Sequence, residues 1–405
     1  MNESSNSSSA ALTEAEIAHQ RSLTPGAANV THLNHAGSSL PTQKVLDTQL
    51  DYLTNEANIG GYEAAAQTYE LAEDVYSSIA KLIGAKPSEI ARVEHATTGW
   101  NAAFWSLPMA KGQRIITVEA EYGANAIAFF RARERYGVSI EVLPSTPAGA
   151  VDLDVLEATL DDDVAVVALT HVPTNGGLIN PAAEVGALTK AAGVPYLLDV
   201  CQSAGQINLN VDELGCDFLS ATGRKYLRGP RGTGFLYVAD TILDRLTPNQ
   251  PDHHGAHWLE PDRYEYRSDA RRFEYWEFNH AAWHGLGAAV DHANSVGLDR
   301  IETTVQERAT ALRSALAEHG FQTFDIGDHK AGIVTTACPG VAAATAKAEL
   351  SKRSVNVSVT TPDSTWWDAA RRNLPDLLRL SVHYITTPEE VEEAVADLAD
   401  IRSNA

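Results

Sequence analysis

The sequence has few cysteines and no long apolar run, and each absence excludes a class of protein. Its 405 residues contain three cysteines, Cys201, Cys216 and Cys338, an odd number at wide spacing. This spacing supports neither a disulfide framework nor a paired set of zinc ligands. The longest apolar runs, such as 164–169, are far shorter than the ~20 residues that cross a bilayer. We therefore expect a protein of the reducing cytoplasm without a membrane partner.

Positive charge is also scarce. Lys and Arg number 31 against 53 Asp and Glu, which gives a net charge of −22. A field of this sign repels phosphate backbones and anionic lipids, so we expect no nucleic-acid partner. The first residues, 1–11, are rich in Ser and Asn and lack the basic and apolar parts of a signal peptide. We predict a disordered tail there.

Short β-rich runs alternate with amphipathic helical segments between about residues 97 and 238. The helical periodicity over 125–136 and 182–192 ends at Gly137 and Gly193, where a helix commonly stops. This alternation predicts an α/β fold with a doubly wound, mostly parallel sheet buried on both faces. Such sheets bind their ligands beyond the carboxyl ends of the strands. The expected strands are 115–119, 139–143, 164–169, 196–199, 218–221 and 234–238.

The last third of the chain has a different pattern. A stretch rich in Pro, His and Asp, 247–269, precedes expected helices over 279–296 and 301–319. A C-terminal helix is predicted from its N-cap, Thr387, which is followed by Pro388. We predict three parts. Residues 1–32 form a tail and an N-terminal arm that joins the small domain, residues 33–275 form a large domain, and residues 276–405 form the smaller α+β domain.

Four short segments carry polar side chains where strands end or helices begin. Thr97 and Thr98 stand at an expected helix start, where free N–H groups and the helix dipole favour a phosphate. A buried strand delivers Asp199 at its carboxyl end, and Lys225 follows the end of another strand. Each feature taken alone is common in proteins without any such site. The four segments are 94–101, 171–177, 197–205 and 220–226.

Together and in this order, the segments resemble the pyridoxal-phosphate (PLP) enzymes of the class V aminotransferase group, which includes the cysteine desulfurases. The resemblance covers about residues 31–401 and implies fold type I, PLP as cofactor, a homodimer and a small amino-acid substrate. It implies that Lys225 forms a Schiff base with PLP and that Asp199 pairs with the pyridine nitrogen, so that the ring withdraws electrons from the substrate. The other implied cofactor contacts are Thr97, Thr98, Asn175 (or its neighbour Thr174), Gln202, Thr222 and Arg224.

The same resemblance implies the residues around the substrate. Arg379 matches the arginine that binds the α-carboxylate, for which a bidentate guanidinium is suited. Asn34 and Tyr62 are the further substrate contacts that it implies. Tyr122 stands where desulfurases have a histidine that stacks on the ring, so it keeps the flat face but loses a group that titrates near neutrality. We count Tyr122 with Lys225 and Asp199 among the catalytic residues.

One departure from the desulfurases points to a different reaction. They carry a nucleophilic cysteine shortly before the substrate arginine, whereas residues 355–364 contain none. A second set of motifs, 58–62, 171–175, 224–234 and 356–359, resembles the hercynylcysteine sulfoxide lyases, with isopenicillin N epimerases and cystine lyases as close relatives. We therefore predict a PLP-dependent C–S lyase that acts on a cysteine S-conjugate or its sulfoxide. Transamination and epimerisation remain alternatives.

A histidine-rich region offers a competing interpretation. His253, His254 and His257, together with His280 and His284, form a possible metal site, and the alternative to an enzyme is a metal- or ligand-binding protein on the same sheet. No glutamate follows His280 as a metalloprotease helix requires, and no thiolate is near in sequence. We therefore predict no metal.

Overall fold

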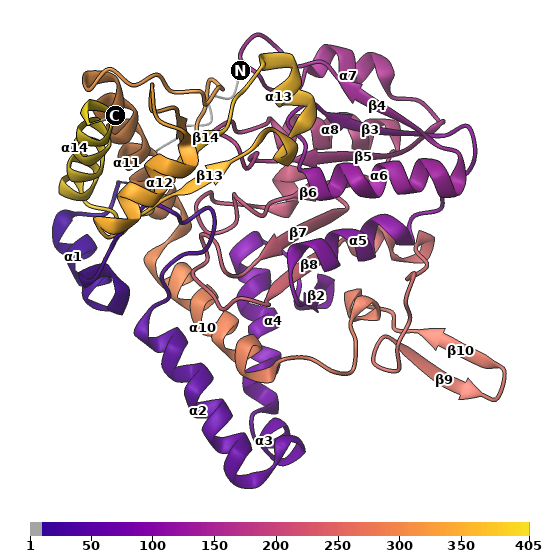
Figure 1. Ribbon diagram of the computed structural model, residues 1–405. Coiled ribbons are helices and arrows are strands. Elements are labelled where there is room, and N and C mark those ends of the chain that lie inside the picture. The colour runs from indigo at the N-terminus through magenta and orange to yellow at the C-terminus, as the bar shows by residue number, and fades with distance from the viewer. Residues whose placement is uncertain (1–9, 405) are drawn as a thin grey trace.

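The computed structural model describes residues 10–404, so the predicted tail at 1–11 lies, except for its last two residues, outside the described part. A seven-stranded sheet with the order β2-β8-β7-β6-β5-β3-β4 forms the centre of the molecule (Figure 1). All of its strands are parallel except β8, which is antiparallel to β2 and β7. This confirms the predicted mostly parallel α/β sheet. The strands are β2 (Ile90–Val93), β3 (Arg114–Val118), β4 (Ser139–Leu143), β5 (Val164–Thr170), β6 (Tyr196–Asp199), β7 (Phe218–Thr222) and β8 (Gly234–Val238).

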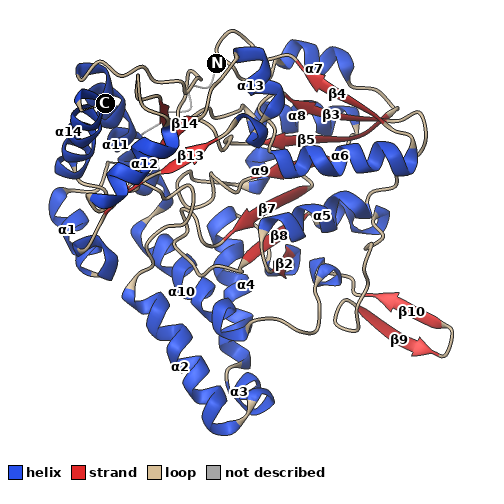
Figure 2. Ribbon diagram, viewed as in Figure 1, coloured by secondary structure: helices blue, strands red, loops and turns tan. Residues whose placement is uncertain are grey.

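Successive side chains of the central strands enter two different apolar clusters. Val166 and Leu197 pack in one cluster, whereas Val167 and Leu198 pack in the other, because neighbouring side chains of a strand point to opposite faces. The sheet is therefore buried on both sides, and Figure 2 shows helices on both of its faces. Helices α5 (Ala96–Ser106) and α6 (Gly123–Tyr136) supply the first cluster, and α4 (Tyr69–Ile83), α8 (Ala182–Ala192) and α10 (His280–Val296) supply the second.

The local signals for helix ends are confirmed. Gly137 and Gly193 adopt left-handed backbone angles at the ends of α6 and α8, with φ of 72° and 69°. The last helix, α14 (Pro388–Ser403), begins at Thr387, whose hydroxyl accepts from the Glu390 N–H at 3.2 Å. The Glu390 carboxylate in turn accepts from the Thr387 N–H, which completes a capping box.

A second, three-stranded antiparallel sheet has the order β11-β14-β13 and lies with the C-terminal helices. The N-terminal segment contacts this part of the molecule, since Arg21 pairs with Glu390 at 2.7 Å and the Leu12 N–H donates to the Thr304 hydroxyl. The elements are α1 (Glu14–Ser22), β1 (Thr31–His32), α11 (Leu298–Glu318), β11 (Ile333–Thr336), α12 (Ala343–Lys352), β12 (Val355–Asn356), β13 (Ser358–Thr360), α13 (Trp366–Arg372) and β14 (Leu377–Ser381).

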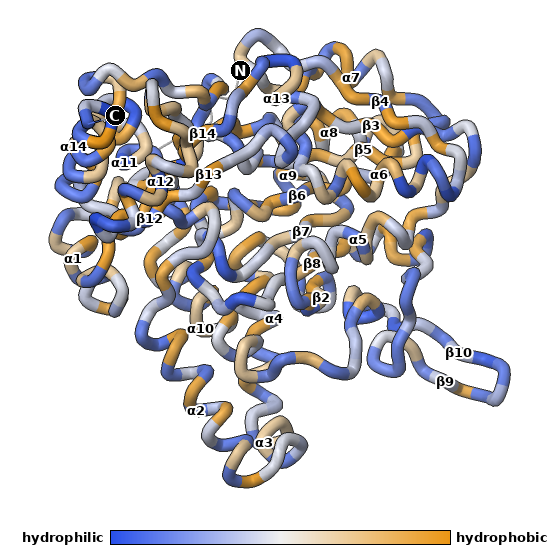
Figure 3. Tube along the Cα trace, viewed as in Figure 1, coloured by the Kyte–Doolittle hydropathy of each residue, from blue (hydrophilic) through white to orange (hydrophobic). Residues whose placement is uncertain are grey.

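Two features project from the body in Figure 1. One is the helical pair α2 (Gln43–Ile59) and α3 (Gly61–Gln67), and the other is the hairpin β9 (Ala256–Glu260) and β10 (Arg263–Tyr266), which occupies the Pro-, His- and Asp-rich stretch. Figure 3 shows apolar positions concentrated in the central strands, with additional ones on α2. Two short helices, α7 (Leu153–Thr159) and α9 (Val211–Leu214), complete the large part. Within residues 10–404, no helix is long and apolar enough to span a membrane.

Candidate active site

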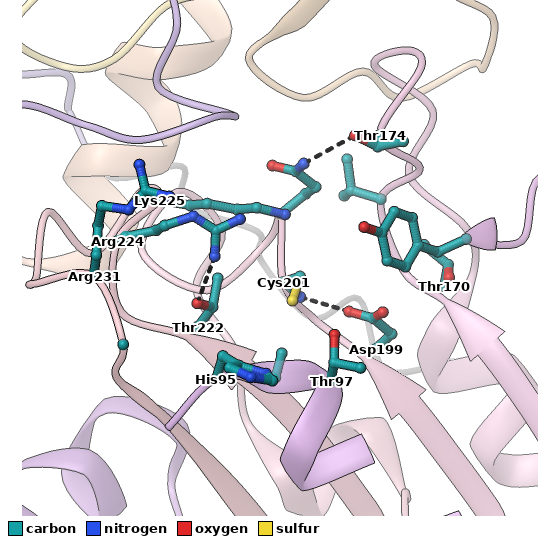
Figure 4. A pocket seen from close by; sticks show the side chains of 15 residues that line it. His95, Thr97, Thr170, Thr174, Asp199, Cys201, Thr222, Arg224, Lys225 and Arg231 are labelled. Atoms are coloured by element: carbon teal, nitrogen blue, oxygen red, sulfur yellow. Dashed lines mark hydrogen bonds between the residues drawn. The ribbon is translucent and has the colours of Figure 1, made fainter. Parts of the chain in front are cut away.

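A cavity of about 340 Å³ lies at the carboxyl ends of β5, β6 and β7, where a parallel sheet places its ligand (Figure 4). It brings together most of the residues that the sequence singled out, although they come from segments far apart in the chain. The predicted residues in its wall are Thr97, Tyr122, Thr174, Asp199, Gln202, Thr222, Arg224 and Lys225. The sequence analysis did not predict the others, which are His95, Ala96, Thr170, Val172, Cys201, Arg231 and Gly232.

Asp199 is the last residue of β6, and its carboxylate is held from two sides. The Cys201 backbone N–H donates to Oδ1 at 2.8 Å, and the Asn125 side-chain amide donates to Oδ2 at 3.2 Å. Only 5% of the residue is exposed. Donors on two sides fix the plane of this buried carboxylate, which suits a partner for a protonated ring nitrogen.

Lys225 lies in the turn after β7 and is half-buried in the wall of the cavity. Burial lowers the pKa of its amine, and the positive charges of Arg224 and Arg379 lower it further, although Asp199 acts in the opposite direction. An amine with a lowered pKa is more often neutral, and the neutral form attacks a carbonyl group or accepts a proton. The place and environment of Lys225 therefore suit covalent attachment of an aldehyde cofactor.

The first turn of α5 and the end of β7 form a cradle for an anion. Thr97 and Thr222 line the same cavity, and the Arg224 guanidinium donates to the Thr222 hydroxyl at 3.1 Å. The Thr98 N–H donates to the ring of His95 at 3.2 Å, so this histidine caps the helix. The Thr98 side chain itself lines the adjacent cavity of about 360 Å³, together with Thr97. Helix N–H groups, hydroxyls and a guanidinium are the donors that a phosphate requires.

Arg379, on β14, contacts the wall of this cavity through Thr174. Its Nη1 donates to the Thr174 hydroxyl at 2.7 Å, and the Gln202 amide donates to that hydroxyl at 3.4 Å. Burial lowers the pKa of the Arg379 guanidinium. Gln202 Oε1, in the cavity wall, and Arg379 Nε are buried without a hydrogen-bond partner, so both are available to a ligand. The residues present therefore fit PLP together with an amino acid.

Asn175 does not face the cavity. Its side-chain nitrogen donates to the Thr365 hydroxyl at 2.6 Å, and its oxygen accepts from the Thr360 hydroxyl. Thr360 ends β13 and Thr365 precedes α13, so the Asn175 side chain ties the segment after β5 to these C-terminal elements. The other residue considered at this point, Thr174, lies in the cavity wall (Figure 4). The contact expected of Asn175 therefore moves to Thr174.

Tyr62 is also not brought to the cavity of its own chain. It lies on α3 at the projecting end of the helical pair and is 80% exposed. Asn34, in contrast, pairs through a bridge with Ser381, which ends the strand that carries Arg379. Its side-chain oxygen, which is buried without a hydrogen-bond partner, therefore lies beside that strand.

Tyr122 and Cys201 both line the cavity. Tyr122 is the N-cap residue of α6 and is 40% exposed, and burial raises the pKa of its phenol. The turn after β6 places Cys201 in the cavity wall. Burial and the charge of Asp199 raise the pKa of its thiol to about 12. The thiol is therefore protonated and a poor nucleophile at neutral pH.

Three of the histidines considered as metal ligands have other partners. His254 contacts the buried carboxylate of Glu274 at 3.0 Å, and the rings of His280 and His284 pack on Tyr52. Across residues 10–404, no group of three or more His, Cys, Asp or Glu side chains is arranged to hold a metal ion.

Comparison with known proteins decides the family. Residues 31–394 match the family model for class V aminotransferases. The chain belongs to this family. Class V enzymes use PLP, and this chain is accordingly a PLP-dependent enzyme of fold type I, as the sequence motifs predicted.

Several relatives have names that refer to carbon–sulfur chemistry. A cysteine desulfurase of Serratia proteamaculans is 28% identical over 398 residues, which cover 92% of this chain and 93% of that protein. The apo cysteine desulfurase of Thermococcus onnurineus NA1 superimposes with a TM-score of 0.90 at 23% identity, covering 98% of this chain and 100% of that one. The cystine C–S lyase C-DES, solved with its product cysteine persulfide, superimposes with a TM-score of 0.84 at 22% identity, covering 93% and 99%. At these identities the solved structures establish the shared fold.

Proposed function

We propose that this PLP enzyme is a C–S lyase that eliminates a sulfur group from Cβ of a cysteine S-conjugate or its sulfoxide, as a hercynylcysteine sulfoxide lyase does. The observation that carries the proposal is the absence of a cysteine from residues 355–364, shortly before Arg379, where desulfurases carry their nucleophile. Within the described residues, Cys201 is the only cysteine that lines the cavity, and its pKa of about 12 keeps it protonated. Sulfur transfer to an enzyme persulfide needs a thiolate, whereas elimination needs only a leaving group.

Each proposed role follows from the place of the side chain. PLP, when bound, supplies an electron-withdrawing ring for the carbon next to the amino group of the substrate. Arg379 binds the α-carboxylate through its free guanidinium edge, and Asp199 holds the proton of the ring nitrogen. The Lys225 amine accepts the Cα proton, which its lowered pKa allows when the amine is neutral. Thr97, Thr222 and Arg224 hold the phosphate.

The atoms of the proposed reaction balance without a redox partner. Lys225 takes the proton from Cα, the electron pair forms a Cα–Cβ double bond, and the Cβ–S bond breaks with its pair on sulfur. The sulfur group leaves as a sulfenate or thiolate. The remaining three-carbon amine takes up water and yields pyruvate and ammonia. The names of the relatives, which refer to removal of sulfur from cysteine and cystine, support this type of chemistry.

The cofactor attachment is tested by colour. The purified enzyme should be yellow, and Lys225→Ala should lose the absorbance of the covalent link. Lys190→Ala, which changes an exposed lysine on α8, is the matched control and should keep it. A wild-type protein that stays colourless after incubation with PLP would contradict the assignment of Lys225.

The reaction class is tested by its products. A panel of S-substituted cysteines and their sulfoxides should release pyruvate, ammonia and a sulfur species. A transaminase would instead give an oxo acid and aminated cofactor, and an epimerase would only invert Cα, as expected for isopenicillin N epimerases. Stoichiometric amino transfer without pyruvate would defeat the lyase proposal.

We also propose that the enzyme is a homodimer, with the helical pair α2–α3 in the interface. The helical pair and the start of α4 expose a group of large apolar side chains. Monomeric proteins rarely expose so many large apolar side chains together, whereas a subunit interface covers them. These are Leu46, Leu50, Leu53, Ile59, Tyr62, Tyr69 and Leu71. Light scattering should give a mass near twice 43.6 kDa. Leu50→Glu should reduce it to a monomer, whereas Ile127→Glu on α6 should not.

A further inference from the structure

A second buried carboxylate, Glu121, lies behind Asp199 and has no role in the reaction described above. It is 1% exposed and accepts hydrogen bonds from neutral donors only. The Thr117 hydroxyl donates at 2.9 Å, the Tyr122 N–H at 2.7 Å and the Asn125 amide at 2.9 Å, and the Thr170 hydroxyl also donates. Among the described residues, no Lys, Arg or His forms an ion pair with it. A buried carboxylate without a cation is unusual and calls for an explanation.

The Asn125 amide connects the two carboxylates. Its nitrogen donates to Glu121 Oε1 at 2.9 Å and to Asp199 Oδ2 at 3.2 Å, which uses both of its hydrogens. Asn125 lies in the first turn of α6 and is 3% exposed. Because the Cys201 N–H holds the other oxygen of Asp199, both oxygens have a donor on a fixed element.

We propose that Asn125 and Glu121 are positioning residues of the cofactor site, which hold the Asp199 carboxylate in the orientation that receives the ring nitrogen of PLP. The terminal torsion of an aspartate is soft, so the carboxylate needs neighbours to fix its plane. Asn125 fixes Oδ2, and Glu121 fixes Asn125 because its own carboxylate is held by donors on β3, on β5 and at the N-cap of α6. The inference rests on the proposed contact between Asp199 and the ring nitrogen.

The ionisation of Glu121 fits this role. Burial raises its pKa to about 7, and the negative charge of Asp199 raises it as well, against the hydrogen bonds from Thr170, Asn125 and the Tyr122 N–H. The groups on β3, β5 and α6 that contact Glu121 or Asn125 are uncharged. Among the described contacts of these two residues, Asp199 is therefore the one charged group besides Glu121 itself. Below pH 7 the pair of carboxylates therefore holds a proton on Glu121, which relieves repulsion beside Asp199.

Two substitutions distinguish the orientation of the Asp199 carboxylate from the charge on Glu121 as the cause of an effect. Asn125→Leu keeps a branched side chain but removes both donated hydrogen bonds. Glu121→Gln mimics the protonated carboxyl group. Its side-chain oxygen accepts hydrogen bonds from Asn125 and the Tyr122 N–H, and its side-chain nitrogen faces the Thr117 hydroxyl, which rotates to accept. Asn180→Leu is the matched control, because Asn180 is 2% exposed and makes two hydrogen bonds, to Thr170 O and Val151 N, without touching a carboxylate.

The experiment loads each full-length variant with PLP labelled with ¹⁵N in the ring and records the ¹⁵N chemical shift together with the affinity for PLP. Asn125→Leu should move the ring nitrogen toward the unprotonated shift and weaken PLP binding roughly tenfold, the scale of one lost hydrogen bond to a charged group. Glu121→Gln should keep the wild-type shift and an affinity within about twofold. If Asn125→Leu does not fold, Asn125→Ala is measured in its place.

The outcomes separate this inference from the proposed function. A wild-type shift in Asn125→Leu, or an equal change in Asn180→Leu, would overturn the role of Asn125. If Glu121→Gln folds but the ¹⁵N shift of its ring nitrogen differs strongly from the wild-type value, the role of an uncharged Glu121 in holding Asn125 is overturned. If Asp199→Asn leaves the ¹⁵N shift unchanged, Asp199 does not contact the ring nitrogen. In that case the role of Asp199 in the proposed function is wrong, whatever the results for Asn125 and Glu121.

Discussion

Replacing Glu121 by Gln should make the stability of the protein less dependent on pH. The pKa of Glu121 rises from 4.5 to about 7 on folding, chiefly through burial. This difference of about 2.5 pH units corresponds to about 3 kcal/mol of unfolding free energy, at ~1.36 kcal/mol per unit. The pKa is raised in the folded state, so the contribution is complete below pH 4.5 and is lost as the pH rises to 7. The wild type should therefore lose about 3 kcal/mol relative to Glu121→Gln between these limits.

The assay is urea unfolding of the PLP-free protein, followed by circular dichroism at pH 4.5 to 8. The quantity of interest is the difference in unfolding free energy between variant and wild type at each pH, which cancels the titration of all other groups. Glu274→Gln is the control. Although burial raises its pKa, the hydrogen bond from His254 and the charge of Arg92 hold the pKa of Glu274 below its usual value of 4.5. Its contribution to stability is therefore lost only as the pH falls below this value, and the difference for Glu274→Gln should stay nearly flat over most of the assayed range. A flat difference for Glu121→Gln across pH 4.5–8 would refute the reasoning.

Three further predictions follow from single contacts. Arg379→Lys keeps the charge but loses the planar fork, so KM for an amino acid should rise tenfold or more in steady-state assays while PLP affinity stays within about twofold. Because the pKa of Cys201 is about 12, iodoacetamide at pH 8 should label it far more slowly in the folded enzyme than in urea, as peptide mass spectrometry would show. Thr387→Ala removes the cap of α14 and should cost about 1 kcal/mol in chemical unfolding, with exposed Thr310→Ala as a near-neutral control.

The sequence alone determined the elements whose physics is local. Gly137 and Gly193 end their helices because a residue without Cβ adopts left-handed backbone angles at little cost, and Thr387 begins α14 because its hydroxyl caps a free N–H. The buried strands were readable because residues with two covered faces form continuous apolar runs. Asp199 ends one such run and Lys225 lies in the turn after another, but only the resemblance of the combined segments to a known family singled them out.

Only the tertiary structure decided which side chains meet. Thr174 and Asn175 are indistinguishable as neighbours in sequence, but Thr174 contacts Arg379, 205 residues away, while Asn175 donates to Thr365. No local pattern marks Asn125 as the link between Glu121 and Asp199, because that link depends on how α6 packs over the end of β6. Contacts of this kind are set by the packing of whole elements, and a one-residue change of register is enough to exchange the side chain that faces the site.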